Sequence, residues 1–260
     1  MRARSIERIA IFGVRGQMGS LFGQKALEAG YKVDGFDLPL DLEHIRSLLP
    51  ASELVLLCVP MDALDSLLSK ISPYLSCQQI LMDICSVKVL PLRTMKKYFQ
   101  GAVIGSHPLF GPVQQQEFRK VALCVDDHKA SYLKKGLEFW QKLGFEPFLC
   151  TAQEHDQAMA YIQGLNFITT LTYFACKAGE EPIKRFITPS FKRRLDAAQK
   201  MLRQDFKLFA TMFERNPYSA DCIRQFRSFL NLAAAGEIEV LAEKSWWWWK
   251  STYKKGKDKS

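Results

Sequence analysis

The chain has 260 residues, enough for one large domain or two of ordinary size. Hydrophobic residues make up 48% and charged residues 24%, a balance that excludes a chain disordered over most of its length. The net charge is +9, but the basic residues form no continuous patch and show no zinc-finger or basic-zipper spacing. We therefore expect no nucleic-acid partner, and we attribute part of the excess charge to an anionic small ligand.

The seven cysteines are scattered and contain no C-x-x-C pair, which argues against a metal site and against a redox dithiol. The N-terminus leads into a strand without an apolar stretch of the signal-peptide type. No run approaches the ~20 apolar residues of a membrane-spanning helix. We expect a cytoplasmic protein with no membrane span and no metal.

Short apolar runs alternate with amphipathic stretches over residues 1–150, the pattern of a parallel sheet covered by helices on both faces. The run at 54–59 is almost wholly apolar, as a central strand buried on both faces should be. The predicted strands are 9–12, 31–37, 54–59, 80–83, 103–106, 122–125 and 146–149. The fold class predicted for this part is a doubly wound α/β sheet.

The pattern becomes helical after residue 150, with apolar positions three and four apart over 153–178, 190–215 and 220–242. We expect a second, all-helical domain over residues 151–250, followed by a disordered basic tail over 251–260. Helices this apolar in so small a unit favour a homodimer built through them. The four indoles from Trp246 to Trp249 cannot share one helix face, and we assign them a packing role.

A glycine-rich turn follows the first predicted strand and opens a helical pattern, the position at which backbone N–H groups approach a phosphate closely. Val14 stands where the first glycine of the usual fingerprint is expected. Asp37 ends the second predicted strand, where a carboxylate binds ribose hydroxyls and repels the additional phosphate of NADP. These features predict a Rossmann-type domain that binds NAD. The cofactor-binding residues proposed are Gly13, Arg15, Gly16, Gln17, Met18, Gly19, Asp37, Val59 and Pro60.

Two further segments stand at the carboxyl ends of predicted strands. They should therefore lie at the same edge of the sheet, where open α/β sheets bind ligands. The first runs from Asp83 to Lys88 and the second, G-S-H-P-L-F-G-P, from 105 to 112. We expect His107 to lie in a loop beyond the strand end, a position that favours a functional role over a packing role.

The glycine-rich turn, the D-I-x-S-V-K segment, the G-S-H-P-L-F-G-P loop and a helix beginning Q-E-H-D together resemble the prephenate and arogenate dehydrogenase family. The resemblance implies NAD-dependent oxidative decarboxylation of prephenate to 4-hydroxyphenylpyruvate, in tyrosine biosynthesis. It implies that His107 is the catalytic base, that Ser86 orients this histidine or the substrate hydroxyl, and that Lys88 lies near the active-site edge. Gln163 belongs to the matching helix and is a candidate substrate-binding residue.

The chain departs from the family at two positions of the helical half. Lys200 stands where an arginine usually grips the side-chain carboxylate of the substrate, and lysine lacks the bidentate fork. Arg203 is the nearest candidate to assist, and Arg193 or Arg194 could also substitute. Phe167 replaces a histidine often found in the long helix.

His155 is assigned to the helix start, where its acidic neighbours suit the positive end of the helix dipole. Three alternatives to prephenate oxidation remain open. Arogenate is a possible substrate within the same family. The chain could instead be a non-catalytic nucleotide-binding protein, or a different Rossmann dehydrogenase with a helical dimer domain.

Overall fold

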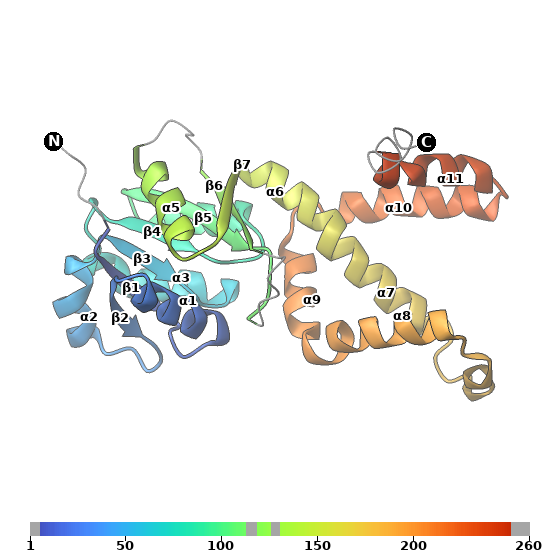
Figure 1. Cartoon of the computed structure of the whole chain (residues 1–260), viewed down its shortest axis with the longest axis horizontal. Helices are drawn as coiled ribbons and strands as arrows, with labels where there is room; N and C mark the ends of the chain where they lie inside the picture. Colours follow the sequence, from blue (N-terminus) through green and yellow to red (C-terminus); the bar gives the residue numbers. More distant parts are fainter. Residues whose placement is uncertain (1–5, 113–118, 126–130, 251–260) are drawn as a thin grey trace, which may run out of the picture.

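The computed structural model describes residues 6–112, 119–125 and 131–250. The chain forms a sheet domain (residues 6–150) and a helical region (residues 151–250) that extends away from it (Figure 1). The expected disordered tail lies outside the described residues. None of the described helices is both long enough and apolar enough to cross a membrane.

The sheet domain is built on a seven-stranded sheet in the order β2-β1-β3-β4-β5-β6-β7. The strands are β1 Arg8–Phe12, β2 Lys32–Phe36, β3 Leu54–Leu57, β4 Ile80–Asp83, β5 Ala102–Pro108, β6 Lys120–Cys124 and β7 Glu146–Cys150. Strands β1 to β5 are parallel, whereas β6 pairs antiparallel with β5 and parallel with β7. The predicted doubly wound sheet is confirmed as mostly parallel, and its last two strands run antiparallel to the other five. The β5–β6 connection is short and has no crossover helix among its described residues, and an antiparallel pair needs none.

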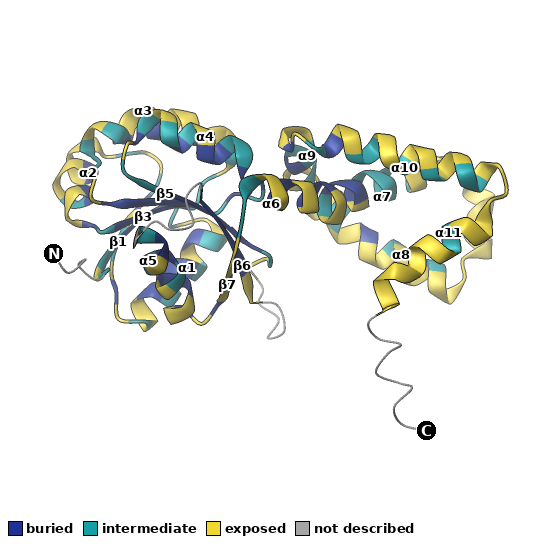
Figure 2. Cartoon of the chain, turned by 90° about the horizontal axis from the view of Figure 1, so that it is seen from above, coloured by how far each residue is buried: buried dark blue, intermediate teal, exposed yellow. Residues whose placement is uncertain are grey.

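Helices cover both faces of the sheet (Figure 2). One face carries α1 Gln17–Glu28 and α5 Ser131–Lys142, and the other carries α2 Leu42–Leu48, α3 Leu64–Ile71 and α4 Val89–Tyr98. Each face has its own apolar cluster, centred on Phe22 and Trp140 on the first and on Leu68 and Met95 on the second. Every residue of β3 is buried, as its apolar run predicts. Short 3-10 turns at Leu49–Ala51, Met61–Ala63 and Ser72–Tyr74 complete this part.

The helical region begins with a capping box, in which the Thr151 and Glu154 side chains each bond the other residue's backbone N–H. Its first rod consists of α6 Ala152–Met159, a π-helical turn η4 Ala160–Leu165 and α7 Asn166–Ala175. The chain returns through η5 Glu181–Phe186, α8 Pro189–Gln199, a second π-helical turn η6 Lys200–Gln204 and α9 Phe206–Arg215. It ends in α10 Ser219–Ala234, α11 Ile238–Ser245 and η7 Trp246–Trp249.

All three long helices predicted for this region depart from one regular α-helix. The stretch over 153–178 contains the π-helical turn η4 without a break in the helix, whereas the stretch over 190–215 is divided at η6 and the stretch over 220–242 is divided at Gly236. Gly236 has φ +86°, a left-handed conformation that ends a helix at little cost only for glycine. A period near 3.6 continues across both interruptions, so the apolar pattern alone does not reveal them.

Candidate active site

The turn between β1 and α1 depends on its three glycines. Gly13 has φ +80°, and a Cβ on it would lie 2.4 Å from the Cys58 carbonyl oxygen. A Cβ on Gly19 would lie 2.0 Å from the Gly13 carbonyl oxygen, and one on Gly16 would lie 3.2 Å from the same atom. No larger residue fits at Gly13 or Gly19 without moving backbone. The turn therefore places bare backbone at the start of α1, as phosphate binding requires.

Val14, the departure from the usual glycine fingerprint, is accommodated by the neighbouring strand. A Cβ on Gly35 of β2 would lie 2.9 Å from the Val14 side chain, so the glycine makes room for the valine. The backbone N–H groups of Gly13 and Val14 both donate to the Phe36 carbonyl, at 2.8 and 3.3 Å. The missing glycine of the turn is thus compensated by a glycine in β2.

Asp37 lies directly after β2 and binds the glycine-rich turn. The Arg15 backbone N–H donates to Asp37 Oδ2 and the Leu38 N–H donates to Oδ1, each at 2.8 Å. The bond from the Arg15 N–H is the largest cause of the lowered pKa of the Asp37 carboxyl, so the group is ionised at neutral pH. The Arg15 side chain turns toward the same carboxylate and toward the Leu38 carbonyl.

A cavity of about 290 Å³ opens beside this turn. Five of the nine proposed cofactor-binding residues line it, namely Gly13, Gly16, Asp37, Val59 and Pro60. Arg15, Gln17, Met18 and Gly19 do not line the cavity but belong to the same turn and to the first turn of α1. The wall also includes Lys70 of α3, a cation that the sequence analysis did not single out.

A buried ion pair joins the ends of β4 and β5. The side chain of Lys88 is 0% exposed, and its Nζ lies 2.6 Å from Asp83 Oδ2 and 2.6 Å from the Ser106 carbonyl oxygen. We expected Lys88 near the active-site edge, but the structure places its ammonium group inside the protein. Ser86 is half-buried between β4 and α4, and no hydrogen bond among the described residues joins it to His107.

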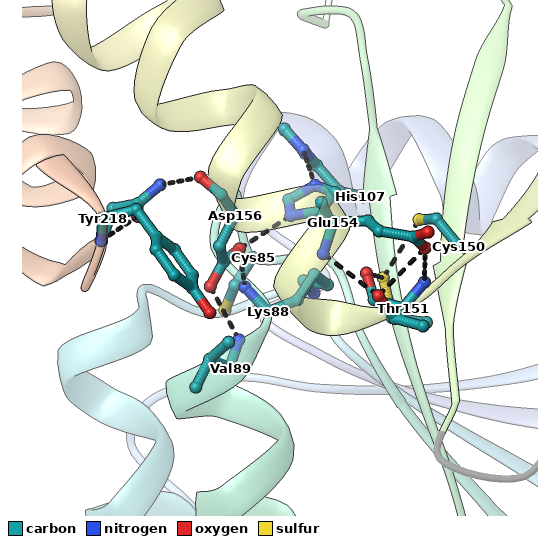
Figure 3. A network of polar contacts seen from close by, with 12 residues as sticks. Cys85, Lys88, Val89, His107, Cys150, Thr151, Glu154, Asp156 and Tyr218 are labelled. Carbon is teal, nitrogen blue, oxygen red and sulfur yellow. Dashed lines mark hydrogen bonds and ion pairs between the residues drawn. The ribbon is translucent and has the colours of Figure 1, made fainter. Parts of the chain in front are cut away.

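His107 lies within β5, opposite Ala122 of β6, and not in a loop beyond the strand. It is 4% exposed, and its Nδ1 lies 2.9 Å from Nε2 of His155 on α6. The other ring nitrogen of His155, Nδ1, lies 2.8 Å from Asp156 Oδ1. Three side chains from both parts of the chain therefore form one buried row, shown in part in Figure 3.

Burial is the largest cause of lowered pKa values at both histidines. The pKa of His107 falls well below the ordinary value of 6.5, and the charges of His155 and Lys88 lower it further. The pKa of His155 is also lowered, but its hydrogen bond to Asp156 opposes the shift. Both imidazoles are therefore neutral at pH 7, the form in which a histidine accepts a proton.

The proposed substrate-binding residues lie in the two π-helical turns. Gln163 is half-buried in η4, and its Oε1 has no hydrogen-bond partner among the described residues. Lys200 and Arg203 are both exposed in η6. Single π-helical turns occur often at functional sites, because they turn side chains away from the regular helix face.

Two of the other positions noted in the helical region, Phe167 and Arg194, contact aromatic rings. Phe167 is buried, and its ring stacks on Phe209 at 5.9 Å between centroids and contacts Phe206. Arg193 and Arg194 are both exposed, and the guanidinium of Arg194 lies 3.6 Å from the centre of the Tyr173 ring. Arg194 is therefore a poorer candidate than Arg203 to assist Lys200 with a carboxylate.

The sheet domain matches a known family model, and similarity to individual proteins continues into the helical region. Residues 25–146 match the family model described as the nucleotide-binding domain of prephenate dehydrogenase. This part of the chain, just under half of its length, is similar to that nucleotide-binding domain. The match includes Asp37, the segment from Asp83 to Lys88, and His107, and it begins after the glycine-rich turn.

Similarity to individual proteins extends into the helical region. The chain is 29% identical over 222 residues to a T-protein of Enterobacter agglomerans, which covers 84% of this chain and 59% of that protein. The chain thus spans little more than half the length of this curated relative.

Two solved structures share the fold. The structure of A. aeolicus prephenate dehydrogenase in complex with hydroxyphenyl propionate and NAD+ has a TM-score of 0.75 at 17% identity, and all of both chains is covered. The structure of Synechocystis arogenate dehydrogenase has a TM-score of 0.73 at 19% identity, with 96% of this chain and 98% of that chain covered. At these identities the likeness shows that the Rossmann sheet and the helical region together form the fold of these dehydrogenases.

Sequence reasoning undervalued His155 and did not assign Asp156 or Asp83 a role. His155 does stand in the first turns of a helix, but its ring faces His107 and not the helix dipole alone. The signal that could have indicated this was a histidine and an aspartate side by side near a helix start, after a strand that ends at the same sheet edge. No group of three metal-binding side chains occurs within residues 6–112, 119–125 and 131–250.

Proposed function

We propose that the chain oxidises prephenate with NAD and releases carbon dioxide and 4-hydroxyphenylpyruvate. The observation that carries this proposal is His107, a neutral buried imidazole whose Nε2 takes part in no hydrogen bond among the described residues. It lies at the carboxyl edge of the sheet, within residues 25–146, which match the family model of the prephenate dehydrogenase nucleotide-binding domain. A hydroxyl group at this atom would meet a base and no competing donor.

The described residues fit NAD. The Gly13–Gly19 turn presents backbone where a Cβ would collide, and the start of α1 offers N–H groups to a pyrophosphate. Asp37 is ionised and lines the adjoining cavity, where its carboxylate would accept hydrogen bonds from ribose hydroxyls. When bound, NAD supplies the hydride acceptor for the ring carbon that bears the hydroxyl group.

The residues of the chain then orient the substrate and handle its proton. His107 Nε2 accepts the hydroxyl proton as the ring carbon loses its hydride, and the carboxylate leaves as carbon dioxide while the ring becomes aromatic. Ser86 stands at the same sheet edge to orient the hydroxyl group. Lys88 acts indirectly, because its ammonium ties Asp83 to the Ser106 carbonyl beneath His107.

The side-chain carboxylate of the substrate is assigned to η6. Lys200 offers a point charge there and Arg203 is close enough in sequence to assist, while Gln163 in η4 offers an amide with an unpaired oxygen. Arogenate differs from prephenate by an amino group in place of the keto group, and it remains the alternative substrate. The fold is shared with solved structures of both kinds of dehydrogenase, so the choice of substrate is left to the assay described below.

We also propose a homodimer formed through the helical region. Leu208, Leu230 and Ile238 are each more than half exposed, as are Trp246 to Trp249. A second copy of the chain would bury these apolar side chains, and an interface of this kind exceeds ~2,000 Å².

The test is to follow NADH formation with prephenate and arogenate side by side, each with NAD and with NADP. We expect the highest kcat/KM with prephenate and NAD, with one carbon dioxide released per NADH. A higher kcat/KM with arogenate would mean that arogenate is the substrate, and the proposed roles of the residues would stay the same. Tight NAD binding with no turnover of either substrate would favour the non-catalytic nucleotide-binding alternative.

A further inference from the structure

We propose that His155 and Asp156 form a proton relay behind His107, so that the proton taken from the substrate leaves a positive charge on His155 and not on His107. The row of side chains described above carries this inference, with contacts of 2.9 Å between the two rings and 2.8 Å to the carboxylate. The inference rests on the proposed function, because it requires His107 to act as the base.

The contacts of Asp156 determine which ring nitrogens carry hydrogen. Its Oδ1 accepts the Lys88 backbone N–H at 2.7 Å, and its Oδ2 accepts the Val89 N–H at 2.9 Å, both at the start of α4 (Figure 3). Both oxygens of this carboxylate accept backbone N–H groups, and a carboxylate oxygen acts only as an acceptor. The His155 Nδ1 that contacts Oδ1 must therefore carry a hydrogen.

The remaining tautomers follow from this one. In a neutral imidazole only one nitrogen carries hydrogen, so the Nε2 of His155 is an acceptor. Its partner, His107 Nδ1, must then be the donor. This leaves His107 Nε2 without hydrogen, which is the form required of a base. The chain of contacts thus prepares His107 for proton transfer before any substrate binds.

Charge favours moving the proton onward from His107. Burial, and to a smaller extent the Lys88 charge, lowers the pKa of both histidines, so the difference between them lies in their carboxylate contacts, and the ring of His107 contacts no carboxylate among the described residues. Asp83 is already paired with Lys88. His155 contacts the Asp156 carboxylate directly, while Glu154 on the same helix is bound to Thr151. A positive charge is therefore more stable on His155 than on His107.

The relay consists of two proton transfers, in each of which one bond to hydrogen breaks and one forms. The substrate O–H bond breaks and a hydrogen binds His107 Nε2, while the His107 Nδ1–H bond breaks and that hydrogen binds His155 Nε2. His107 ends neutral with its hydrogen on the opposite nitrogen, and His155 becomes an imidazolium paired with Asp156. The reverse transfer restores the resting tautomers when the proton returns to solvent.

The relay also links the base to the contact between the two parts of the chain. Asp156 binds α4 of the sheet domain through its carboxylate, and its carbonyl accepts a hydrogen bond from Asn216 Nδ2 at 2.7 Å, between α9 and α10. His155 therefore reaches His107 only while α6 is docked against the sheet domain. The helical region thereby positions the base as well as the substrate.

The first test needs no turnover. The chain has four histidines, so ring ¹⁵N chemical shifts in the full-length protein can be assigned by comparing single substitutions. At pH 7.5 we expect both His107 and His155 to carry hydrogen on Nδ1, whereas exposed histidines in water favour the Nε2–H form. Hydrogen on Nε2 of His107 would overturn the proposal.

The second test uses His155→Gln, which keeps an acceptor for the His107 Nδ1–H but cannot be protonated. With prephenate and NAD we expect kcat to fall roughly 10- to 100-fold with little change in KM. The rate measured in mixtures of H₂O and D₂O should change from a curved to a linear dependence on deuterium content, because one moving proton replaces two. The matched control is Gln157→Ala, an exposed change on the same helix.

Each outcome separates the relay from the proposed function. A wild-type rate in His155→Gln, or an unchanged curved isotope dependence, would overturn the relay while leaving prephenate oxidation in place. A wild-type chain that oxidises neither prephenate nor arogenate would overturn the proposed function, and the ring ¹⁵N shifts would still decide the tautomers on which the relay depends.

Discussion

The sheet domain and the helical region bury their side chains very differently. Each residue of β3 and β4 is buried, and the faces of the sheet carry two continuous apolar clusters. In contrast, α8, α9 and α10 each contribute one buried residue and α11 contributes none. The sheet domain therefore has a complete core of its own. The helical region gains a comparable core only against a second surface, for which we propose another copy of the chain.

The same difference applies to the active site. The nucleotide turn, Asp37 and His107 are positioned by strands of the sheet, whereas Lys200 and Arg203 are exposed on a helical turn. Substitutions in the sheet domain should consequently affect chemistry and folding in a single chain. Apart from His155 and Asp156, which contact the sheet domain, substitutions in the helical region should affect substrate affinity and assembly.

The largest effect is expected for His107→Asn, which retains the size of the ring and part of its hydrogen bonding but removes the base. The value of kcat for prephenate should fall by about 10²–10⁴, with KM little changed, because the lost interaction forms mainly in the transition state. Steady-state kinetics on the folded variant measure this effect. Full activity would end the mechanism proposed for the sheet domain.

The second prediction compares the two cores directly. Leu56→Ala, in a strand with no exposed side chain, should reduce the free energy of unfolding by about 2–5 kcal/mol at any protein concentration. Leu230→Ala, at a position 52% exposed, should cost no more than about 0.5 kcal/mol in dilute solution. Its cost should grow at concentrations where the dimer forms.

Urea unfolding at two protein concentrations, together with sedimentation, makes this comparison. The dimer proposal would be wrong if Leu230→Ala had the same small effect at every concentration and the wild-type chain sedimented as a monomer at micromolar concentration.

How far the sequence predicts the molecule also differs between the two parts. Apolar runs located all seven strands, because buried β-strands have a strong local pattern, but the pattern carries no strand direction and did not reveal that β6 runs antiparallel to β5. The turn at Gly13 and the site of Asp37 were predicted, since both depend on local backbone geometry. The partnership of His155 with His107 was missed, because it joins residues 48 apart through packing.

The third prediction concerns the cofactor. Asp37→Ser should narrow the preference for NAD over NADP by roughly 1–3 kcal/mol, because it removes a charge-assisted hydrogen bond to ribose and relieves repulsion of the additional phosphate. The ratio of the two kcat/KM values measures this preference. Lys70 in the cavity wall is a cation that could hold such a phosphate, so Asp37→Ser should bind NADP less well when Lys70→Ala is added. A wild-type enzyme that prefers NADP would contradict the placement of Asp37.

The fourth prediction tests the helical region. Lys200→Ala should raise KM for prephenate about tenfold with kcat largely retained, since the lysine is proposed to bind the substrate carboxylate in ground and transition states alike. Lys200→Arg should preserve or improve KM by supplying a bidentate fork. An unchanged KM in Lys200→Ala would move the carboxylate contact to Arg203 or Arg193 and leave the role of His107 intact.

The smallest effect is on the dependence of stability on pH. His107 and His155 have pKa values lowered mainly by burial, so the folded chain binds fewer protons than the unfolded chain once the pH falls below the ordinary value of 6.5. The free energy of unfolding that the two histidines contribute is fully present above pH 6.5 and decreases as the pH falls. At pH 5.5, the loss is at most about 1.4 kcal/mol for each histidine.

His155→Gln removes one of these two groups. Unfolding free energies at pH 5.5 and pH 7.5 should therefore differ less in His155→Gln than in the wild-type chain, by up to that amount. Carboxyl groups elsewhere titrate in both proteins and cancel in the comparison. An equal pH dependence in the two proteins would mean that His155 binds a proton as readily in the folded chain as in the unfolded one, which its burial between β5 and Asp156 opposes.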